Sequence, residues 1–234
     1  MSDLTKIINQ DYITEKIDKE YEQRRIHRAH LGLSECGHPC QRALWYIYNN
    51  YPQEPIPGRI LRLFQLGNIL EAQIRNDLMA AGFAMSSDQT EVNFDYIDNK
   101  TDKKYILTGH IDGIISGLDE SKKQHLWECK TASEKAFKKL LKLESYEEWN
   151  IKYKFQLHAY MLGMDLDRAL VTVYNKNDSS LYQEIIKLDK DYIIKGLQAV
   201  ASTIALTDPP PRMCPRDDWW EAKLCNYREA CWRL

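Results

Sequence analysis

The residues best suited to do chemistry lie in two short segments, residues 109–113 and 127–130. The first segment carries Asp112 next to a glycine, and the second carries Glu128 and Lys130 two positions apart. Residues two apart in a strand project to the same side, so Glu128 and Lys130 are expected to face one space. Two carboxylates and the backbone carbonyl of Cys129 offer the hard oxygen ligands that Mg²⁺ prefers. The pattern therefore indicates phosphodiester hydrolysis assisted by Mg²⁺ or Mn²⁺, with Lys130 orienting the attacking water or stabilising negative charge on the phosphate.

A plainer interpretation places Asp112 in a turn and makes Glu128 and Lys130 an exposed cross-strand pair. The neighbours of Glu128 argue against it, because this carboxylate lies between Trp127 and Cys129 in an apolar run. A lone charge in such surroundings is costly unless it is paired or bound to a metal.

The chain has six cysteines, which fall mostly near its two ends. A disulfide framework is not expected, because the first 22 residues are polar and do not resemble a secretion signal. In a reducing compartment such thiols are buried apolar groups, metal ligands or redox groups. The cysteines outside the middle of the chain are Cys36, Cys40, Cys214, Cys225 and Cys231.

Composition limits the function classes. With 234 residues, of which 44% are apolar, the sequence predicts a single globular unit, and no apolar run is long enough to cross a membrane. We therefore expect a soluble protein of the cytoplasm. A net charge of -2 excludes a strongly basic protein that coats nucleic acid, so any contact with phosphates must be local. Basic clusters at residues 24–28 and 135–142 are interpreted as solvated helix faces.

The pattern of apolar residues predicts an α/β (α+β) protein. Helices are expected over residues 11–30, 34–46, 63–82, 133–143, 148–164 and 191–206. Four short β-branched or aromatic runs, at 91–94, 105–107, 111–115 and 125–129, are expected to form consecutive antiparallel strands, and two more strands at 169–174 and 181–188. Prolines at 209–211 predict an extended connection into a tail rich in cysteine and tryptophan.

Several motifs then follow one another along almost the whole chain. Ser34 opens a segment that continues five residues later as Cys40-Gln41-Arg42-Ala43-Leu44-Trp45-Tyr46. It is followed by Gly67-x3-Glu71, Gly109-x2-Asp112-Gly113, Glu128-x-Lys130 and Gln156-x3-Tyr160. This series resembles the PD-(D/E)xK nuclease superfamily, specifically its RecB-like branch, which includes lambda-type exonucleases and the iron–sulphur nucleases of CRISPR adaptation.

The resemblance implies a restriction-endonuclease-like core, a mixed central sheet flanked by helices. It implies one nuclease domain over residues 1–234, made of a helical segment (1–58), a catalytic core (59–206) and a tail (207–234) that packs back on the helical segment. Glu71 would join Asp112, Glu128 and the Cys129 carbonyl as a metal ligand, and a glycine one turn before Glu71 would let its helix approach the sheet closely. Lys130, Gln156 and Tyr160 would be catalytic, and Ser34 and Arg42 would bind DNA phosphates.

The sequence also departs from the family pattern. Ile111 and Gln41 stand where the family has prolines, and neither position supplies a ligand. Cys40, Cys225 and Cys231 match the family's iron–sulphur ligands, but Ala222 occupies the place of the remaining cysteine. Cys214 or Cys36 could substitute, so a [4Fe-4S] cluster, a Cys₄ zinc site and buried thiols without metal all stay open.

The predicted function is a metal-dependent DNA exonuclease of recombination, repair or phage DNA processing, in a bacterial or phage-infected cell. A recombination or annealing protein is an expected partner, and a membrane is not. An endonuclease of restriction or junction-resolving type is one alternative, although no specificity domain is evident. A non-catalytic DNA-binding module is another, against which stands the presence of every metal-binding and lysine position.

Overall fold

The computed structural model describes residues 10–24, 31–97, 102–118 and 123–233. Its strands are β1 (Ala84–Ser86), β2 (Glu91–Ile97), β3 (Lys104–His110), β4 (Gly113–Ser116), β5 (Gln124–Ala132), β6 (Arg168–Asn175) and β7 (Leu181–Lys187). Its helices are α1 (Gln10–Gln23), α2 (Leu33–Cys36), α3 (Gln41–Tyr48), α4 (Gly58–Ala80), α5 (Glu134–Leu143), α6 (Tyr146–Trp149), α7 (Ile151–Gly163), α8 (Lys190–Ile204), α9 (Trp220–Lys223) and α10 (Arg228–Arg233).

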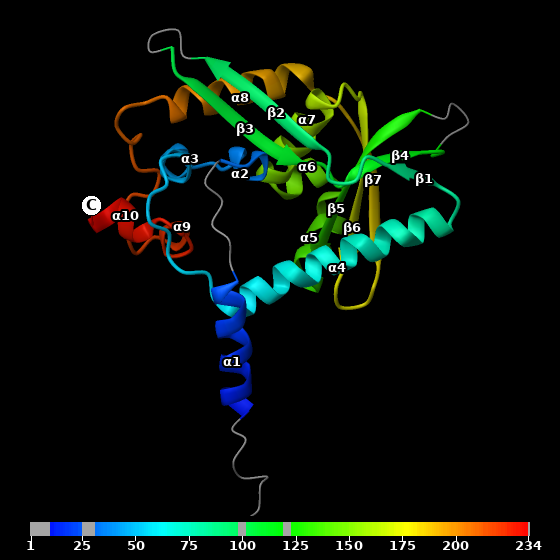
Figure 1. Ribbon diagram of the computed structural model, residues 1–234, viewed down its shortest axis with the longest axis horizontal. Coiled ribbons are helices and arrows are strands. Elements are labelled where there is room, and N and C mark those ends of the chain that lie inside the picture. The colour runs from blue at the N-terminus through cyan, green and yellow to red at the C-terminus, as the bar shows by residue number, and fades with distance from the viewer. Residues whose placement is uncertain (1–9, 25–30, 98–101, 119–122, 234) are drawn as a thin grey trace, which may run out of the picture.

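A five-stranded mixed sheet forms the centre, in the order β1-β4-β5-β6-β7. The β5–β6 pair is parallel and the other pairs are antiparallel. β6 is a run of small, β-branched and aromatic residues that is buried along most of its length, as expected of a central strand covered on both faces. Helices flank this sheet (Figure 1), so the predicted mixed α/β fold class is confirmed.

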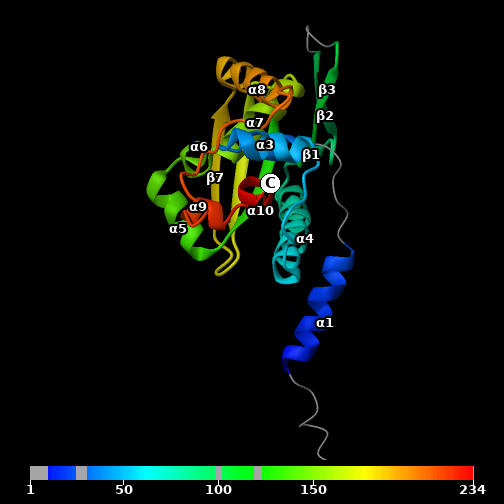
Figure 2. The ribbon, with the colours of Figure 1, turned by 90° about the vertical axis from the view of Figure 1, so that its left-hand side faces the viewer.

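The two faces of the sheet have different covers. On one face the long helix α4 packs over Trp127, Cys129 and Leu170 through Ile74 and Leu78. On the other face the larger apolar core includes residues of α5, α7 and α8 with Leu126, Val171 and Val173 of the sheet. Figure 2 shows α4 and α5 on opposite sides of the strands. Side chains that alternate along β5 therefore enter two separate layers.

β2 and β3 form their own antiparallel two-stranded sheet, in which Glu91 is paired with His110. Helix α7 crosses it at close range, since a Cβ added at Gly163 would lie 2.2 Å from Val92 Cγ1. The expectation of four consecutive antiparallel strands was therefore wrong in one respect. β2 pairs with β3 and β4 pairs with β5, but β3 and β4 lie in different sheets because the chain leaves the hairpin at Ile111 and Asp112.

Several helix boundaries also differ from those predicted. The helix expected over 11–30 is α1, which ends at Gln23, and residues 25–30 lie outside the described residues. The single element expected over 34–46 is two helices, α2 and α3, and that expected over 148–164 is interrupted at Asn150. Asn150 ends α6 with an extended backbone and caps α7 by accepting a hydrogen bond from Lys152 N at 2.9 Å. The strand β1 was not predicted.

The C-terminal segment contacts α3. Tyr227 and Ala230 pack against Ala43, Trp45 and Tyr46 in a small apolar cluster. The Tyr46 hydroxyl donates a hydrogen bond to the Ala230 carbonyl at 3.2 Å. The extended connection over 209–211 is as expected, but the tail beyond it adds two short helices, α9 and α10. Among the described residues, no helix combines the length and the apolar character needed to span a bilayer.

Candidate active site

Asp112 lies at the start of the pairing between β4 and β5. Gly113 is paired with Trp127 in the antiparallel register. When this register is continued by one residue, Asp112 lies opposite Glu128. Asp112 Oδ2 accepts a hydrogen bond from Cys129 N at 2.8 Å. The N–H and C=O of one strand residue point to the same edge, so the Cys129 carbonyl, the predicted backbone ligand, also faces Asp112. The pairing of β4 with β5 begins at Gly113. Just before it, the Asp112 carboxylate accepts the hydrogen bond from β5 that the backbone of a further β4 residue would otherwise accept.

Glu128 and Lys130 project from β5 to the same side, as the spacing predicted. Glu128 is completely buried, and its Oε1 forms an ion pair with Lys130 Nζ. Lys130 keeps 19% of its side chain exposed, and its Nζ lies 5.4 Å from the centroid of the Tyr153 ring on α7. Lys130 is therefore the member of the pair that solvent can reach.

Glu71 reaches the same region from α4, on the other side of the sheet. Its pKa responds to the charges of Asp112 and Lys130, which places these three groups in one electrostatic neighbourhood. β4 begins only at Gly113, so β5 has no strand partner beside Cys129 and Lys130 on that edge, and a helix-borne carboxylate can approach.

The steric role predicted for Gly67 is wrong. A Cβ at this position would lie 3.7 Å from Thr131 Oγ1, which is an ordinary van der Waals contact. α4 approaches β5 here, but the approach does not require glycine.

Burial and like charges disfavour the ionised form of all three carboxyl groups. Burial, together with Asp112, raises the pKa of Glu71 to about 7. Burial raises the pKa of Glu128 to about 8 against the opposing charge of Lys130, and burial also raises the pKa of Asp112. Burial alone would lower the pKa of Lys130, but Glu128 and Asp112 raise it well above its ordinary value. Three acidic groups thus share one ammonium, and a cation would relieve the remaining repulsion.

Arg75 and Asp88 belong to this neighbourhood and were not predicted. Arg75 Nη1 donates a hydrogen bond to the Asp112 carbonyl at 2.9 Å and lies 3.3 Å from Asp88 Oδ1. Arg75 follows Glu71 by four residues and so shares its helix face, a periodicity that could have identified it. Asp88 lies in the loop between β1 and β2, for which the local sequence offered no signal.

A polar cavity of about 800 Å³ opens beside these groups. Ser34, Glu71, Asp112, Gln156 and Tyr160 are the predicted site residues that line it, whereas Glu128, Lys130 and Arg42 do not. Its wall also contains Asn68, Arg75, Asp88, Gln89, Thr108, Gly109 and His110.

Gln156 and Tyr160 meet in the cavity wall. Gln156 Nε2 donates a hydrogen bond to the Tyr160 hydroxyl at 3.3 Å, and both side chains are buried. Gly109 makes room for this tyrosine, since a Cβ there would lie 2.7 Å from Tyr160 Oη. The predicted pair therefore shares one helix face and one space.

The charge of Lys130 acts on all three carboxyl groups and lowers the pKa of each. Within the described part of the chain, no three His, Cys, Asp or Glu side chains meet at the spacing of a complete metal site. Glu128 Oε2, however, is buried and has no hydrogen-bond partner among those residues. A buried carboxylate oxygen without a partner is costly, and a divalent cation held with Asp112 and Glu71 would satisfy it. The donor set is therefore suitable for Mg²⁺ or Mn²⁺.

Arg42 lies away from the cavity, against the C-terminal segment. Its Nη1 donates to the Pro210 carbonyl at 2.7 Å and its Nε to the Tyr46 hydroxyl at 2.9 Å. These contacts hold the guanidinium in the packing between α3 and the tail. A role in phosphate binding stays a prediction, and it requires these hydrogen bonds to be exchanged.

Four cysteines gather where the tail meets α3. Cys40, Cys225 and Cys231 pack around the cluster that contains Tyr46 and Tyr227. Burial, the charge of Glu221 and the nearby Cys40 and Cys231 raise the pKa of the Cys214 thiol, so Cys214 belongs to the same region. The other candidate, Cys36, is buried in the main core and donates to the Gly32 carbonyl at 3.4 Å. All six cysteines are free thiols.

Comparison with known proteins gives a fold and no family. No family model matches the sequence, and no curated protein matches it. A crystal structure of SSO0001 is similar with a TM-score of 0.53 and 17% identical residues, over 96% of each chain. The alkaline exonuclease LHK-Exo of Laribacter hongkongensis gives a TM-score of 0.49 at 16% identity, over 80% of this chain and 91% of the exonuclease. Its complex with dAMP gives 0.47 at 16% identity, over 82% and 91%. At these identities, the comparison with SSO0001 shows that the two chains share a fold.

Proposed function

We propose that this protein is a divalent-metal-dependent nuclease that hydrolyses DNA from its ends. The observation that carries the proposal is the position of Asp112, Glu128 and Lys130 at the open edge of β5, with Glu71 approaching from α4. Of these groups, Asp112 and Glu71 line a polar cavity of about 800 Å³, which would receive the end of a DNA strand.

Asp112, Glu128, Glu71 and the Cys129 carbonyl would hold Mg²⁺ or Mn²⁺. Such an ion lowers the pKa of water and neutralises charge on phosphoryl oxygens. The chain's own contribution is a protonated Lys130, whose raised pKa keeps its ammonium charged at neutral pH. This ammonium stabilises the negative charge that develops on the phosphate during hydrolysis. Gln156 and Tyr160, which line the cavity, would hold the substrate.

The test is digestion of linear duplexes labelled at the 5′ or 3′ end, with Mg²⁺ or Mn²⁺, beside covalently closed circular DNA. Cleavage of the linear DNA alone is expected. Cleavage of both substrates would replace end-directed hydrolysis by an endonuclease activity. Intact DNA at high concentration of folded protein would contradict the proposal and favour a module that binds DNA without cutting it.

A matched pair of lysine variants makes the test specific. Lys130→Met is expected to abolish cleavage, whereas Lys142→Met removes an exposed lysine of α5 and should leave the rate unchanged. Equal rates in the two variants would show that the cleavage comes from a contaminating nuclease.

We further propose that Cys40, Cys214, Cys225 and Cys231 bind a [4Fe-4S] cluster. Four free thiols in one region match the ligand number that such a cluster requires. Among the described residues no three of them lie at the spacing of a metal site, so binding of the cluster would draw them together. The buried Ala222 provides no ligand, and the structure favours Cys214 over Cys36 as the fourth thiol because Cys36 lies in the main core. The cluster would join the tail to the N-terminal end of α3.

Anaerobic purification with a visible absorption spectrum and metal analysis tests this second proposal. Iron with sulphide supports the cluster, zinc with no visible absorption shows a Cys₄ zinc site instead, and absence of both shows structural thiols. Cys214→Ser should remove the metal, whereas Cys36→Ser should retain it.

A further inference from the structure

The loop over residues 87–90, between β1 and β2, holds two residues in a backbone conformation that side chains rarely adopt. Ser87 has a φ of 57° and Gln89 a φ of 53°, both in the left-handed region. The Thr90 hydroxyl donates a hydrogen bond to the Ser87 carbonyl at 3.1 Å and closes the turn. Strained backbone of this kind persists only where surrounding contacts hold it, and it gathers at functional sites. The contacts of this loop therefore indicate its role.

The backbone of the loop is tied to the strand segment that carries Asp112. β1 pairs with β4 in the central sheet, whereas β2 pairs with β3 in the two-stranded sheet. The loop therefore crosses from one sheet to the other, and residues 111–112 make the same crossing between β3 and β4. The Thr90 carbonyl accepts a hydrogen bond from Ile111 N at 3.0 Å. This bond holds the loop beside the residue that precedes Asp112.

The side chains of the loop reach helix α4. Asp88 Oδ1 lies 3.3 Å from Arg75 Nη1, and Gln89 Nε2 donates a hydrogen bond to Glu71 Oε1 at 3.3 Å. Glu71 and Arg75 are one helical turn apart, so two consecutive loop residues contact one face of α4. Asp88 and Gln89 also line the cavity together with Glu71 and Asp112. The loop thus joins the segment of one proposed metal ligand to the side chain of another.

The amide of Gln89 is chemically suited to orient a metal ligand. A carboxylate has two oxygens, so Glu71 can accept the amide hydrogen bond on Oε1 while its other oxygen faces a cation. The amide carries no charge, whereas a lysine or arginine at this position would repel a divalent ion bound to the same carboxylate. A glutamate side chain without such a bond samples several rotamers, and ordering it on a metal costs entropy.

We propose that Gln89 is a positioning residue of the nuclease site, whose amide orients Glu71 so that this carboxylate joins Asp112 and Glu128 on a divalent cation. The inference rests on the proposed function and deepens it. Residues that orient a ligand without touching the metal alter metal affinity or activity by about ten- to a hundredfold when they are removed. Gln89 is exposed and contacts one ligand of the set, so the lower end of this range is expected.

The test compares Gln89→Met with Gln73→Met, because methionine keeps the length of the side chain and removes the amide. Gln73 is the matched control, since its Nε2 donates to Asp77 Oδ1 at 2.8 Å on an exposed part of α4 outside the cavity lining. The metal-free proteins are titrated with Mn²⁺ in a calorimeter. The Kd for Mn²⁺ is expected to rise about tenfold in Gln89→Met and to stay at the wild-type value in Gln73→Met.

Cleavage of end-labelled DNA provides a second measurement. The Mn²⁺ concentration that gives half of the maximal rate should rise about tenfold in Gln89→Met. At saturating Mn²⁺, kcat and the KM for DNA should stay within about twofold of the wild type, because the reacting groups are unchanged. A purely structural role of the loop would instead lower Tm and leave the Mn²⁺ requirement unchanged.

Equal Mn²⁺ affinities of the wild type and Gln89→Met would overturn the proposal. An equal loss of affinity in both variants would overturn it too, and so would a loss that accompanies a fall in Tm of the metal-free protein, because the loop has then lost its fold. Wild-type protein that binds Mn²⁺ but leaves DNA intact would contradict the nuclease function, while the titration would still decide the role of Gln89. Wild-type protein that binds no Mn²⁺ would overturn both.

Discussion

Arg75 donates a hydrogen bond to the backbone carbonyl of Asp112 at 2.9 Å, which joins helix α4 to the residue that precedes β4. The same nitrogen lies 2.8 Å from the place of a Cβ at Gly113, so glycine leaves the space that the guanidinium occupies. Glu71 and Arg75, on one face of α4, thus meet Asp112 from the same side.

This contact predicts that Arg75→Met lowers cleavage by about tenfold, because Asp112 loses the group that fixes its backbone. Steady-state digestion of end-labelled DNA measures the effect. Arg62→Met is the control, since Arg62 lies on the same helix and pairs with Asp18 of α1 rather than with the site. Equal activity in both variants would show that the Asp112 backbone needs no such support.

Gly109 and Gly67 are expected to respond in opposite ways to substitution by alanine. Gly109→Ala places a Cβ 2.7 Å from the Tyr160 ring and 3.0 Å from Leu33 Cβ, so it should cost about 1–3 kcal/mol through overpacking. Gly67→Ala meets only an ordinary contact within α4 and should stabilise the protein by about 0.5–1 kcal/mol, because alanine favours the helix. Urea denaturation measures both. A destabilised Gly67→Ala variant would show that α4 approaches the sheet more closely than the structure indicates.

The Glu128–Lys130 pair should show strong coupling in stability. Lys130→Met leaves a fully buried carboxylate without its ammonium and is expected to cost about 3 kcal/mol. The double variant Glu128→Met/Lys130→Met removes both charges and should recover stability to within about 1 kcal/mol of the wild type. Denaturation of the metal-free protein provides the measurement. Additive losses in the double variant would show that the two side chains do not interact.

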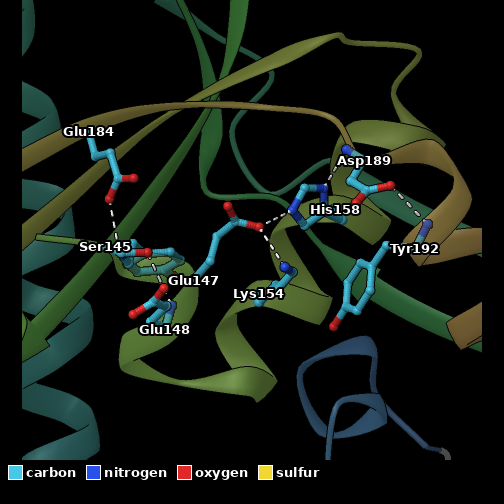
Figure 3. A network of polar contacts seen from close by, with 9 residues as sticks. Ser145, Glu147, Glu148, Lys154, His158, Glu184, Asp189 and Tyr192 are labelled. Atoms are coloured by element: carbon cyan, nitrogen blue, oxygen red, sulfur yellow. Dashed lines mark hydrogen bonds and ion pairs between the residues drawn. The ribbon is translucent and has the colours of Figure 1, made fainter. Parts of the chain in front are cut away.

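The polar network around α6 predicts a pH-dependent contribution to stability. As Figure 3 shows, Glu147 Oε1 accepts a hydrogen bond from His158 Nε2 at 2.8 Å and lies 3.1 Å from Lys154 Nζ. Burial alone would raise the pKa of Glu147, but the hydrogen bonds from His158 and Lys154 lower it below its ordinary value. A carboxyl with a lowered folded pKa stabilises the protein above its unfolded pKa, and this contribution is lost as the pH falls through the folded pKa. Glu147→Gln should therefore cost about 1 kcal/mol at neutral pH, and the difference from wild type should shrink below about pH 4. A difference that is constant with pH would exclude an ionic role.

The sequence predicted which site residues share a face of a strand or helix better than it predicted the contacts between distant segments. Alternation along a strand was enough to set Glu128 and Lys130 on one side, and the four-residue spacing was enough to set Gln156 and Tyr160 on one helix face. Both relations are local, so they depend only on the type of element that the residues occupy.

What the sequence could not predict depends on contacts between distant segments. The hairpin of β2 and β3 alternates like any strand pair, and nothing local indicates that it forms a sheet of its own, separate from the central sheet that the chain joins again at Gly113. Arg42 shows the same limit, since its contact with Pro210 joins residues from opposite ends of the chain.

The parallel pairing of β5 with β6 affects the order in which the chain folds during its synthesis. These two strands can join only after α5, α6 and α7 have been synthesised and folded across the sheet, because a parallel pair requires a long crossover. Contacts so distant along the chain form late, since closing a long loop costs entropy before any pairing compensates it. Nascent chains that end before β6 therefore carry Glu71, Asp112, Glu128 and Lys130 without the complete central sheet, so the proposed site assembles only after β6 has been synthesised.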